Sequence, residues 1–251
     1  MKPVQTSDDS LQAADESVAE RVRQHCGDSI PLIERGLTLH MQALGYLVKS
    51  TRWENEASTL RVTLLTRSFN SCHIAYRSLV WGYHSQALML LRSALDDWLA
   101  ERYVNVHPEE TAKWSVHVLP PPKRSTRMRC LEASDRTRAI KVFQTLDDFD
   151  HPGRRGVWQI MEPRPTGGYL RLGGHLDREW TRIVAYLFLH AISLLHNSLQ
   201  QLTLDMALEP ESSWHGSAEA FDNEATKWID QFNEAAAEKQ RIKSSANDEH
   251  S

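Results

Sequence analysis

The sequence contains Leu91-Arg92-Ser93-Ala94-Leu95-Asp96-Asp97-Trp98, which lies in the second of two helices that we expect between Asn70 and Glu109. Gly82 separates these two helices, because glycine weakens a helix and readily forms turns. The apolar side chains of the second helix cover roughly half of its circumference, which is wider than the apolar stripe of a surface helix. We therefore expect this helix to be central in a helical bundle.

Arg92 and Asp96 stand one helical turn apart at the edge of this apolar arc. One interpretation is an ion pair at the border of the core, which stabilises a helix by only about 0.2–0.5 kcal/mol. The other interpretation is that both side chains reach into a central pocket and bind a ligand or a residue of another helix. A buried charge requires a partner of this kind. The sequence leaves both interpretations open.

Helical periodicity dominates the rest of the chain, and we predict a mainly α fold, namely a multi-helix bundle in a single domain over residues 11–238. Polar composition predicts disordered ends at residues 1–10 and 239–251. Two short apolar runs flank the turn-forming segment from Pro163 to Gly168. This pattern predicts one small β-hairpin insertion near residues 157–172.

A polar stripe that includes Tyr186 and His190 follows the long helix expected over residues 176–208. Such a stripe faces either water or a cavity. In the second case we expect Tyr186, His190 and His151 to converge on Arg92 and to form a binding site.

Composition narrows the class of protein. A net charge of -4 gives no general attraction to nucleic acid or to acidic membranes. Three widely spaced cysteines form neither a disulfide framework nor a zinc motif, which favours the reducing cytoplasm. No apolar run reaches the roughly 20 residues that span a bilayer, so we expect no membrane partner. Phosphate-loop, dinucleotide-binding and nucleophile-elbow motifs are missing from the sequence, and we predict no cofactor and no metal.

Two parts of the chain resemble known families. The run from Ser78 to Leu99, followed by Tyr103-Val104 and by His107-Pro-Glu-Glu110, combines small residues with a Leu-Arg pair and an acidic residue four positions later. The run from Leu146 to Pro152 is the second matching piece. Together they resemble uncharacterised all-helical bacterial families and the abortive-infection and HEPN-like proteins of prokaryotic conflict systems. The resemblance covers residues 57–204 and implies a bacterial, defence-associated helical protein.

HEPN ribonucleases carry an arginine followed by a histidine after four to six intervening residues, and they need no metal. The arginine holds the scissile phosphate and the histidine transfers protons. This chain has four such pairs, which is about the number that chance predicts. Arg102 and His107 are the best placed of them, because they end the central helix. The ordinary interpretation of the two residues is a helix C-terminus followed by a turn that begins at a proline.

Basic residues concentrate in one loop, at Lys123, Arg124, Arg127 and Arg129. An exposed loop of this composition binds phosphate backbones without sequence selectivity, so RNA is a candidate partner. Basic loops are also common as solvated surface. The leading hypothesis is a non-catalytic protein that binds a protein partner or a small ligand, with a ribonuclease and a nucleic-acid binder as the alternatives. The long helices also suit a homodimer.

Overall fold

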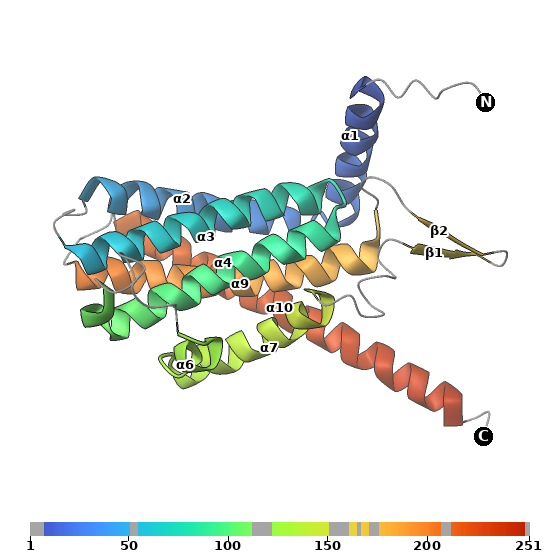
Figure 1. The fold of residues 1–251 in the computed structure, drawn as a ribbon. Coiled ribbons are helices and arrows are strands. Elements are labelled where there is room, and N and C mark those ends of the chain that lie inside the picture. The colour runs from blue at the N-terminus through green and yellow to red at the C-terminus, as the bar shows by residue number, and fades with distance from the viewer. Residues whose placement is uncertain are drawn as a thin grey trace.

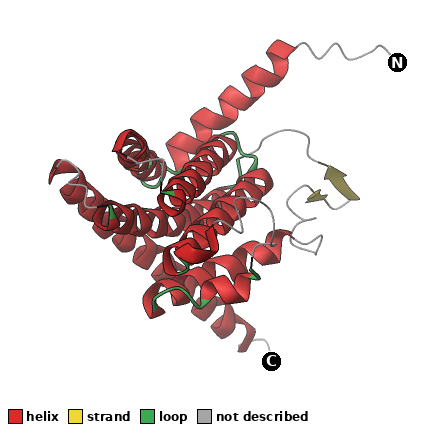
Figure 2. Cartoon of the chain, turned by 60° about the vertical axis from the view of Figure 1, so that its left-hand side comes forward, coloured by secondary structure: helices red, strands yellow, loops and turns green. Residues whose placement is uncertain are grey.

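The computed structural model describes residues 8–50, 55–111, 122–150, 161–164, 167–170, 176–206 and 212–248. Its longer helices are α1 (Asp8–His25), α2 (Ile30–Ser50), α3 (Glu56–Val80), α4 (His84–Val106), α7 (Ala133–Asp150), α9 (Arg178–Asp205) and α10 (Ser212–Asp248). The short elements are the 3-10 helix η1 (Pro108–Glu110), the helix α6 (Arg124–Met128) and the strands β1 (Met161–Arg164) and β2 (Gly167–Leu170). The predicted mainly α bundle is confirmed (Figures 1 and 2).

The helices α3 and α4 form the antiparallel hairpin that the sequence predicts. Gly82 lies between them with φ of 77°, a left-handed conformation that glycine adopts without steric cost. Asn55 begins α3 by accepting a hydrogen bond from the backbone N–H of Ser58 at 3.0 Å. Twelve residues of α4 are buried, including Trp98. This helix therefore lies in the core, as its wide apolar arc indicates.

The helix α9 runs through the middle of the bundle and contacts α2, α3, α4, α7 and α10 (Figure 1). By length and composition it could cross a membrane, but 83% of its apolar window is buried inside the bundle. Asp177 begins this helix by accepting hydrogen bonds from the backbone N–H groups of Glu179 and Trp180. Its apolar composition is thus explained by its position as the core helix.

The predicted β-hairpin insertion requires a correction. The core residues that the structure describes come from helices and from the short connections between them. Regular strand structure is confined to Met161–Arg164 and Gly167–Leu170, which pair antiparallel with each other, and residues 157–160 and 171–172 lie outside the described ranges. A pair of such short strands is marginally stable by itself. The fold is therefore a helical bundle to which strands add no layer.

The two ends of the chain differ from the prediction. We expected disorder over residues 1–10 and 239–251, but α1 begins at Asp8 and α10 continues to Asp248. The C-terminal part of α10 extends beyond the other helices (Figure 1). Over residues 231–239 its exposed side chains are polar or alanine, and most of these residue types have a high helix propensity. Ile242 is an exposed apolar residue farther along the same helix.

A charged network lies between α3, α4 and α9. Arg61 donates from Nε to Glu101 Oε1 and from Nη1 to Asp205 Oδ2, and both distances are 2.7 Å. The side chain of Glu101 has no exposed surface and that of Arg61 is 7% exposed. Burial raises the pKa of Glu101, while the Arg61 charge and hydrogen bond act in the opposite direction. The network therefore fixes the three helices at one level of the bundle.

We expect Arg61→Met to lower the free energy of unfolding by about 3–5 kcal/mol, because it leaves the buried Glu101 carboxylate without a cation. Arg35→Met is the matched control, since Arg35 forms an ion pair with Glu224 on the surface. Removing an exposed pair costs about 1 kcal/mol or less. Urea unfolding of both variants measures the difference. Equal losses in the two variants would contradict a structural role for the buried network.

The close packing of α2 against α9 and α10 depends on Gly36. A Cβ atom at this position would lie 2.7 Å from ring atoms of Phe221 and 2.8 Å from a methyl carbon of Ile192. Phe221 and Ile192 are fully buried, so neither side chain has space to move away. Glycine at this position therefore permits the three helices to approach each other.

We expect Gly36→Ala to lower the free energy of unfolding by about 1–3 kcal/mol through overpacking. Gly45→Ala is the control on the same helix, because a Cβ atom there meets nothing within 4 Å. Alanine in a helix interior is about 0.5–1 kcal/mol more favourable than glycine, so Gly45→Ala should be neutral or stabilising. Thermal unfolding of both variants measures the effect. A stabilised Gly36→Ala variant would show that the contact is looser than described.

Candidate functional site

A cluster of arginines and aspartates joins α4, α6 and α7. Arg92 contacts Asp147 with Nη2 to Oδ1 at 3.1 Å. Arg124 donates from Nη1 to both carboxylate oxygens of Asp147, at 3.1 and 3.0 Å. Asp147 is thus shared between a guanidinium of α4 and one of α6, and it joins α7 to both helices.

Asp96 belongs to the same cluster. It lies 3.6 Å from Arg124 Nε and 3.6 Å from Arg127 Nη2, and its backbone carbonyl accepts a hydrogen bond from Arg127 Nη1 at 2.9 Å. Burial lowers the pKa of Arg127, an effect that the nearby Asp96 charge opposes. The guanidinium of Arg124 also stacks on Phe143, 4.5 Å from the ring centroid. These contacts hold α6 against the bundle, which is a structural function.

The basic segment that the sequence predicts as a loop is helical over Arg124–Met128, and its charges face different surroundings. Arg124 and Arg127 face the aspartates of α4 and α7, as described above, and are not presented to solvent as a pair. Lys123 and Arg129 are exposed, and Arg129 makes a long hydrogen bond of 3.4 Å to Thr126. The four residues therefore do not form one open basic surface.

Arg102 and His107 have different surroundings. The ring of His107 lies 4.6 Å from that of Tyr103, and His107 Nδ1 is 3.4 Å from Glu109. Arg102 is half-buried, and its charge opposes the rise in the pKa of Cys130 that burial causes. Within the described ranges, Arg102 Nε has no hydrogen-bond partner. His151, the remaining predicted binding residue, lies outside the described residues.

Two histidines that the sequence did not indicate lie in the core. The rings of His40 and His196 are 6.1 Å apart, and both side chains are buried. His196 contacts the carbonyl of Gly36 through Nε2 at 3.1 Å, and its Nδ1 is 4.0 Å from Asp222 Oδ1. Burial lowers the pKa of His196 to about 4, while burial raises that of Asp222 to about 6. At neutral pH this pair is therefore an uncharged histidine beside a carboxylate.

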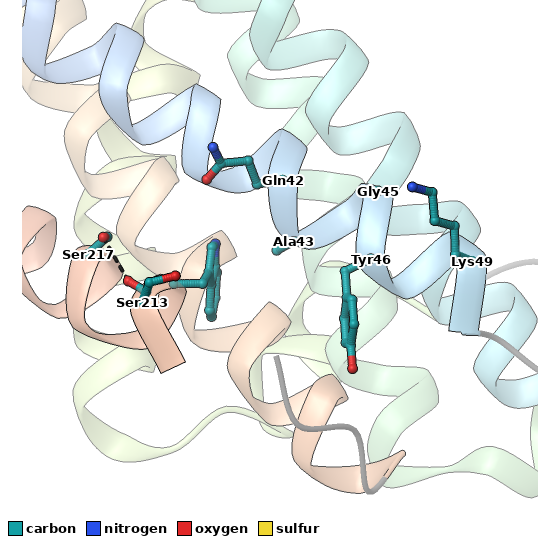
Figure 3. Close-up of a pocket in the computed structure, with 8 residues that line it drawn as sticks. Gln42, Ala43, Gly45, Tyr46, Lys49, Ser213 and Ser217 are labelled. Carbon is teal, nitrogen blue, oxygen red and sulfur yellow. Dashed lines mark hydrogen bonds between the residues drawn. The ribbon is translucent and has the colours of Figure 1, made fainter. Parts of the chain in front are cut away.

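A hollow of about 610 Å³ lies between the second half of α2 and the start of α10. Its polar side chains do not converge: Figure 3 shows Lys49 and Tyr46 pointing in opposite directions, while Ser217 bonds to the backbone oxygen of Ser213. The buried Trp214 also lines it, and its indole N–H is bonded to the carbonyl of Leu39. Ligand sites place a few polar groups around one point, and this hollow does not.

A second hollow, which we call the cleft, lies between α7, α9 and α10. Its volume is about 390 Å³, and apolar surface predominates in its lining. Tyr186 of α9 and Phe232 of α10 form its aromatic floor, with ring centroids 4.8 Å apart. Phe232 stacks in turn on Trp228, at 5.6 Å. The floor is thus a continuous row of rings from two helices.

The polar stripe of α9 meets the cleft at Tyr186. Three residues of the stripe, Tyr186, His190 and Ser193, are buried, so this part of the stripe does not face open water. The His190 ring packs edge-on against Tyr186 at 4.6 Å. Over the described part of the chain, neither the Tyr186 hydroxyl nor either ring nitrogen of His190 has a hydrogen-bond partner. Buried polar atoms of this kind commonly mark a site where a ligand or water completes the bonding.

The structure therefore groups the predicted binding residues differently from the sequence. Arg92 and Asp96 belong to the ion cluster of α4, α6 and α7, while Tyr186 lines the cleft and His190 packs against Tyr186 without lining it. Comparison with known protein families, with curated proteins and with solved structures gives no match. The resemblance to HEPN-like and abortive-infection proteins stays a prediction from the sequence.

We expect stability to fall when the pH drops from 7 to 5. Burial, followed by the charges of Arg138 and Lys141, lowers the pKa of His190 to about 4, and burial lowers that of His196 to about 4. The unfolded chain takes up these protons near pH 6.5 but the folded chain does not, so each histidine costs about 2 kcal/mol at pH 5.

Asp222 acts in the opposite direction, because a raised pKa favours the folded state as the pH falls through about 6. Urea unfolding at both pH values measures the sum of these effects. The variant His190→Leu should lose less stability between pH 7 and pH 5 than the wild type does. The same pH dependence in both proteins would show that His190 is not a buried neutral histidine.

Proposed function

We propose that this chain is a non-catalytic binding protein that holds a small ligand in the cleft between α7, α9 and α10. The aromatic floor of the cleft, with buried polar atoms beside it that lack partners among the described residues, is the observation that carries the proposal. Ligand sites are concave, mostly apolar and about 300–1,000 Å³ in volume, with a small number of polar groups that orient the ligand. A volume of about 390 Å³ falls in this range.

The position of the cleft also supports binding. The floor joins Tyr186 of α9, the helix at the centre of the bundle, to Phe232 of α10. Ala235 and Ala236 of α10 form one wall, and the C-terminal part of α10 extends beyond the other helices (Figure 1). A ligand would therefore connect a rigid helix to a helix with few partners, and ligand binding would stabilise the docked position of α10.

The ribonuclease and nucleic-acid hypotheses rest on the sequence. Arg102 with His107 for the first, and Lys123, Arg129 and their neighbours for the second, stay predictions. The cytoplasmic location and the defence-associated role likewise stay predictions from the sequence. The residues of these two hypotheses lie at the end of α4, next to η1, and in and beside α6. Substitutions there therefore test them without changing the cleft.

The test uses prodan, an uncharged naphthalene dye whose emission shifts to the blue in apolar surroundings. We expect saturable binding of prodan to the wild-type protein. Ala236→Trp should abolish it, because Ala236 lines the cleft and an indole group would fill the space. Ala237→Trp is the matched control, since Ala237 is exposed on the same helix and does not line the cleft.

Circular dichroism and urea unfolding check that both tryptophan variants are folded. Absence of saturable prodan binding to the wild type, or equal binding by the two variants, would contradict the proposed function.

A further inference from the structure

The ligand class follows from charges at the rim of the cleft. We propose that the cleft binds an amphipathic anion, a small molecule with an apolar chain or ring and one carboxylate, sulfate or phosphate group. This inference rests on the proposed function and adds the chemistry of the ligand. Three cations carry it: Lys141 of α7, Arg182 of α9 and Lys239 of α10.

Among the described residues, no carboxylate lies within ion-pair distance of Lys141, Arg182 or Lys239. The arginines of the α4, α6 and α7 cluster differ, because each of them contacts an aspartate. A cation that has no ion-pair partner can bind an anionic ligand without the free-energy cost of breaking an existing ion pair.

Two of the three cations lie over aromatic rings. Lys141 Nζ lies 5.5 Å from the centroid of the Tyr186 ring, and the Arg182 guanidinium lies 5.9 Å from that of Trp228. Cation–π contacts of this length leave the outer hydrogen-bond donors of both groups free. The donors can therefore reach an anionic group at the rim while the rings below pack against an apolar body.

The local charge is opposite to that of the whole protein. Glu179 is the one carboxylate among the described residues that line the cleft, against three cations there, whereas the chain as a whole has a net charge of -4. Burial lowers the pKa of the nearby His190, and the charges of Arg138 and Lys141 act in the same direction. The attraction for an anion is thus specific to this site.

The apolar part of the ligand would occupy the space between Ile183 of α9 and the alanine pair of α10. The small side chains of Ala235 and Ala236 keep this wall open, and Phe232 is half-buried with part of its surface still exposed. The Tyr186 ring forms the floor against which the apolar body would pack, and its hydroxyl oxygen is buried below that floor.

The experiment compares three amphiphiles with the same chain in displacing prodan: decanoate, 1-decanol and decyltrimethylammonium. We expect decanoate to displace the dye at a concentration roughly tenfold or more below that of decanol, and the cation to be the weakest. Exposed charges of this type contribute a factor of about two to five each, and salt screens them. The preference for decanoate should therefore shrink in 0.5 M sodium chloride.

Matched variants identify the charges responsible. Lys239→Gln should weaken decanoate binding about two- to fivefold and leave decanol unchanged. Lys227→Gln is the control, because Lys227 is an exposed lysine of α10 that does not line the cleft. Equal displacement by decanoate and decanol, with prodan still bound at the cleft, would overturn the anion class and leave the proposed function standing. Failure of prodan itself to bind would overturn both.

Two other occupants of the cleft are distinguished by further measurements. Vesicles of phosphatidylglycerol test a membrane surface, and size-exclusion chromatography with light scattering tests a second copy of the chain. We expect no co-sedimentation with vesicles and a molecular mass that Ala236→Trp does not change. Vesicle binding that Ala236→Trp abolishes, or a dimer that the same substitution dissociates, would replace the small anion by that occupant.

Discussion

The buried ion network of Arg61, Glu101 and Asp205 is the constraint on which the arrangement of the bundle depends. A carboxylate with no exposed surface is tolerated only when a cation and good hydrogen-bond geometry accompany it, so α3 and α4 cannot slide along each other. Asp205 adds the C-terminal end of α9 to the same cation. The position of the α3–α4 hairpin along α9 is thereby fixed at the C-terminal end of α9.

The opposite end of α9 is where the cleft lies. Tyr186 is 19 residues before Asp205 on one continuous helix, and every intervening turn is packed in the core. Support of this kind keeps Tyr186 in place as part of the floor of a binding site. Phe232 and Trp228 of α10 complete the row of rings, so the aromatic surface joins two helices of the bundle.

Local patterns were sufficient to predict the helical fold. Gly82, the width of the apolar arc on α4 and the helical period of α9 are all readable from neighbouring residues. The ion network was not predictable, because Glu101 and Asp205 lie 40 and 144 positions from Arg61 and nothing distinguishes Arg61 from other arginines in the chain. The sequence suggested Asp96 as a partner of Arg92, but Arg92 contacts Asp147, which lies on α7. Tyr186 and His190 were predicted as binding residues, but the sequence did not indicate their separation from Arg92.

The arginines between α4, α6 and α7 differ in their partners from the cations at the cleft. Between α4, α6 and α7 the cations meet aspartates, and their charge is consumed in holding a short helix that could not be stable alone. At the cleft they meet aromatic rings, which orient a cation without cancelling its charge. A count of basic residues cannot separate these cases, and in this sequence it indicated the segment 123–138. Among the described residues, Lys141 and Arg182 at the cleft lie beside aromatic rings and have no carboxylate within ion-pair distance.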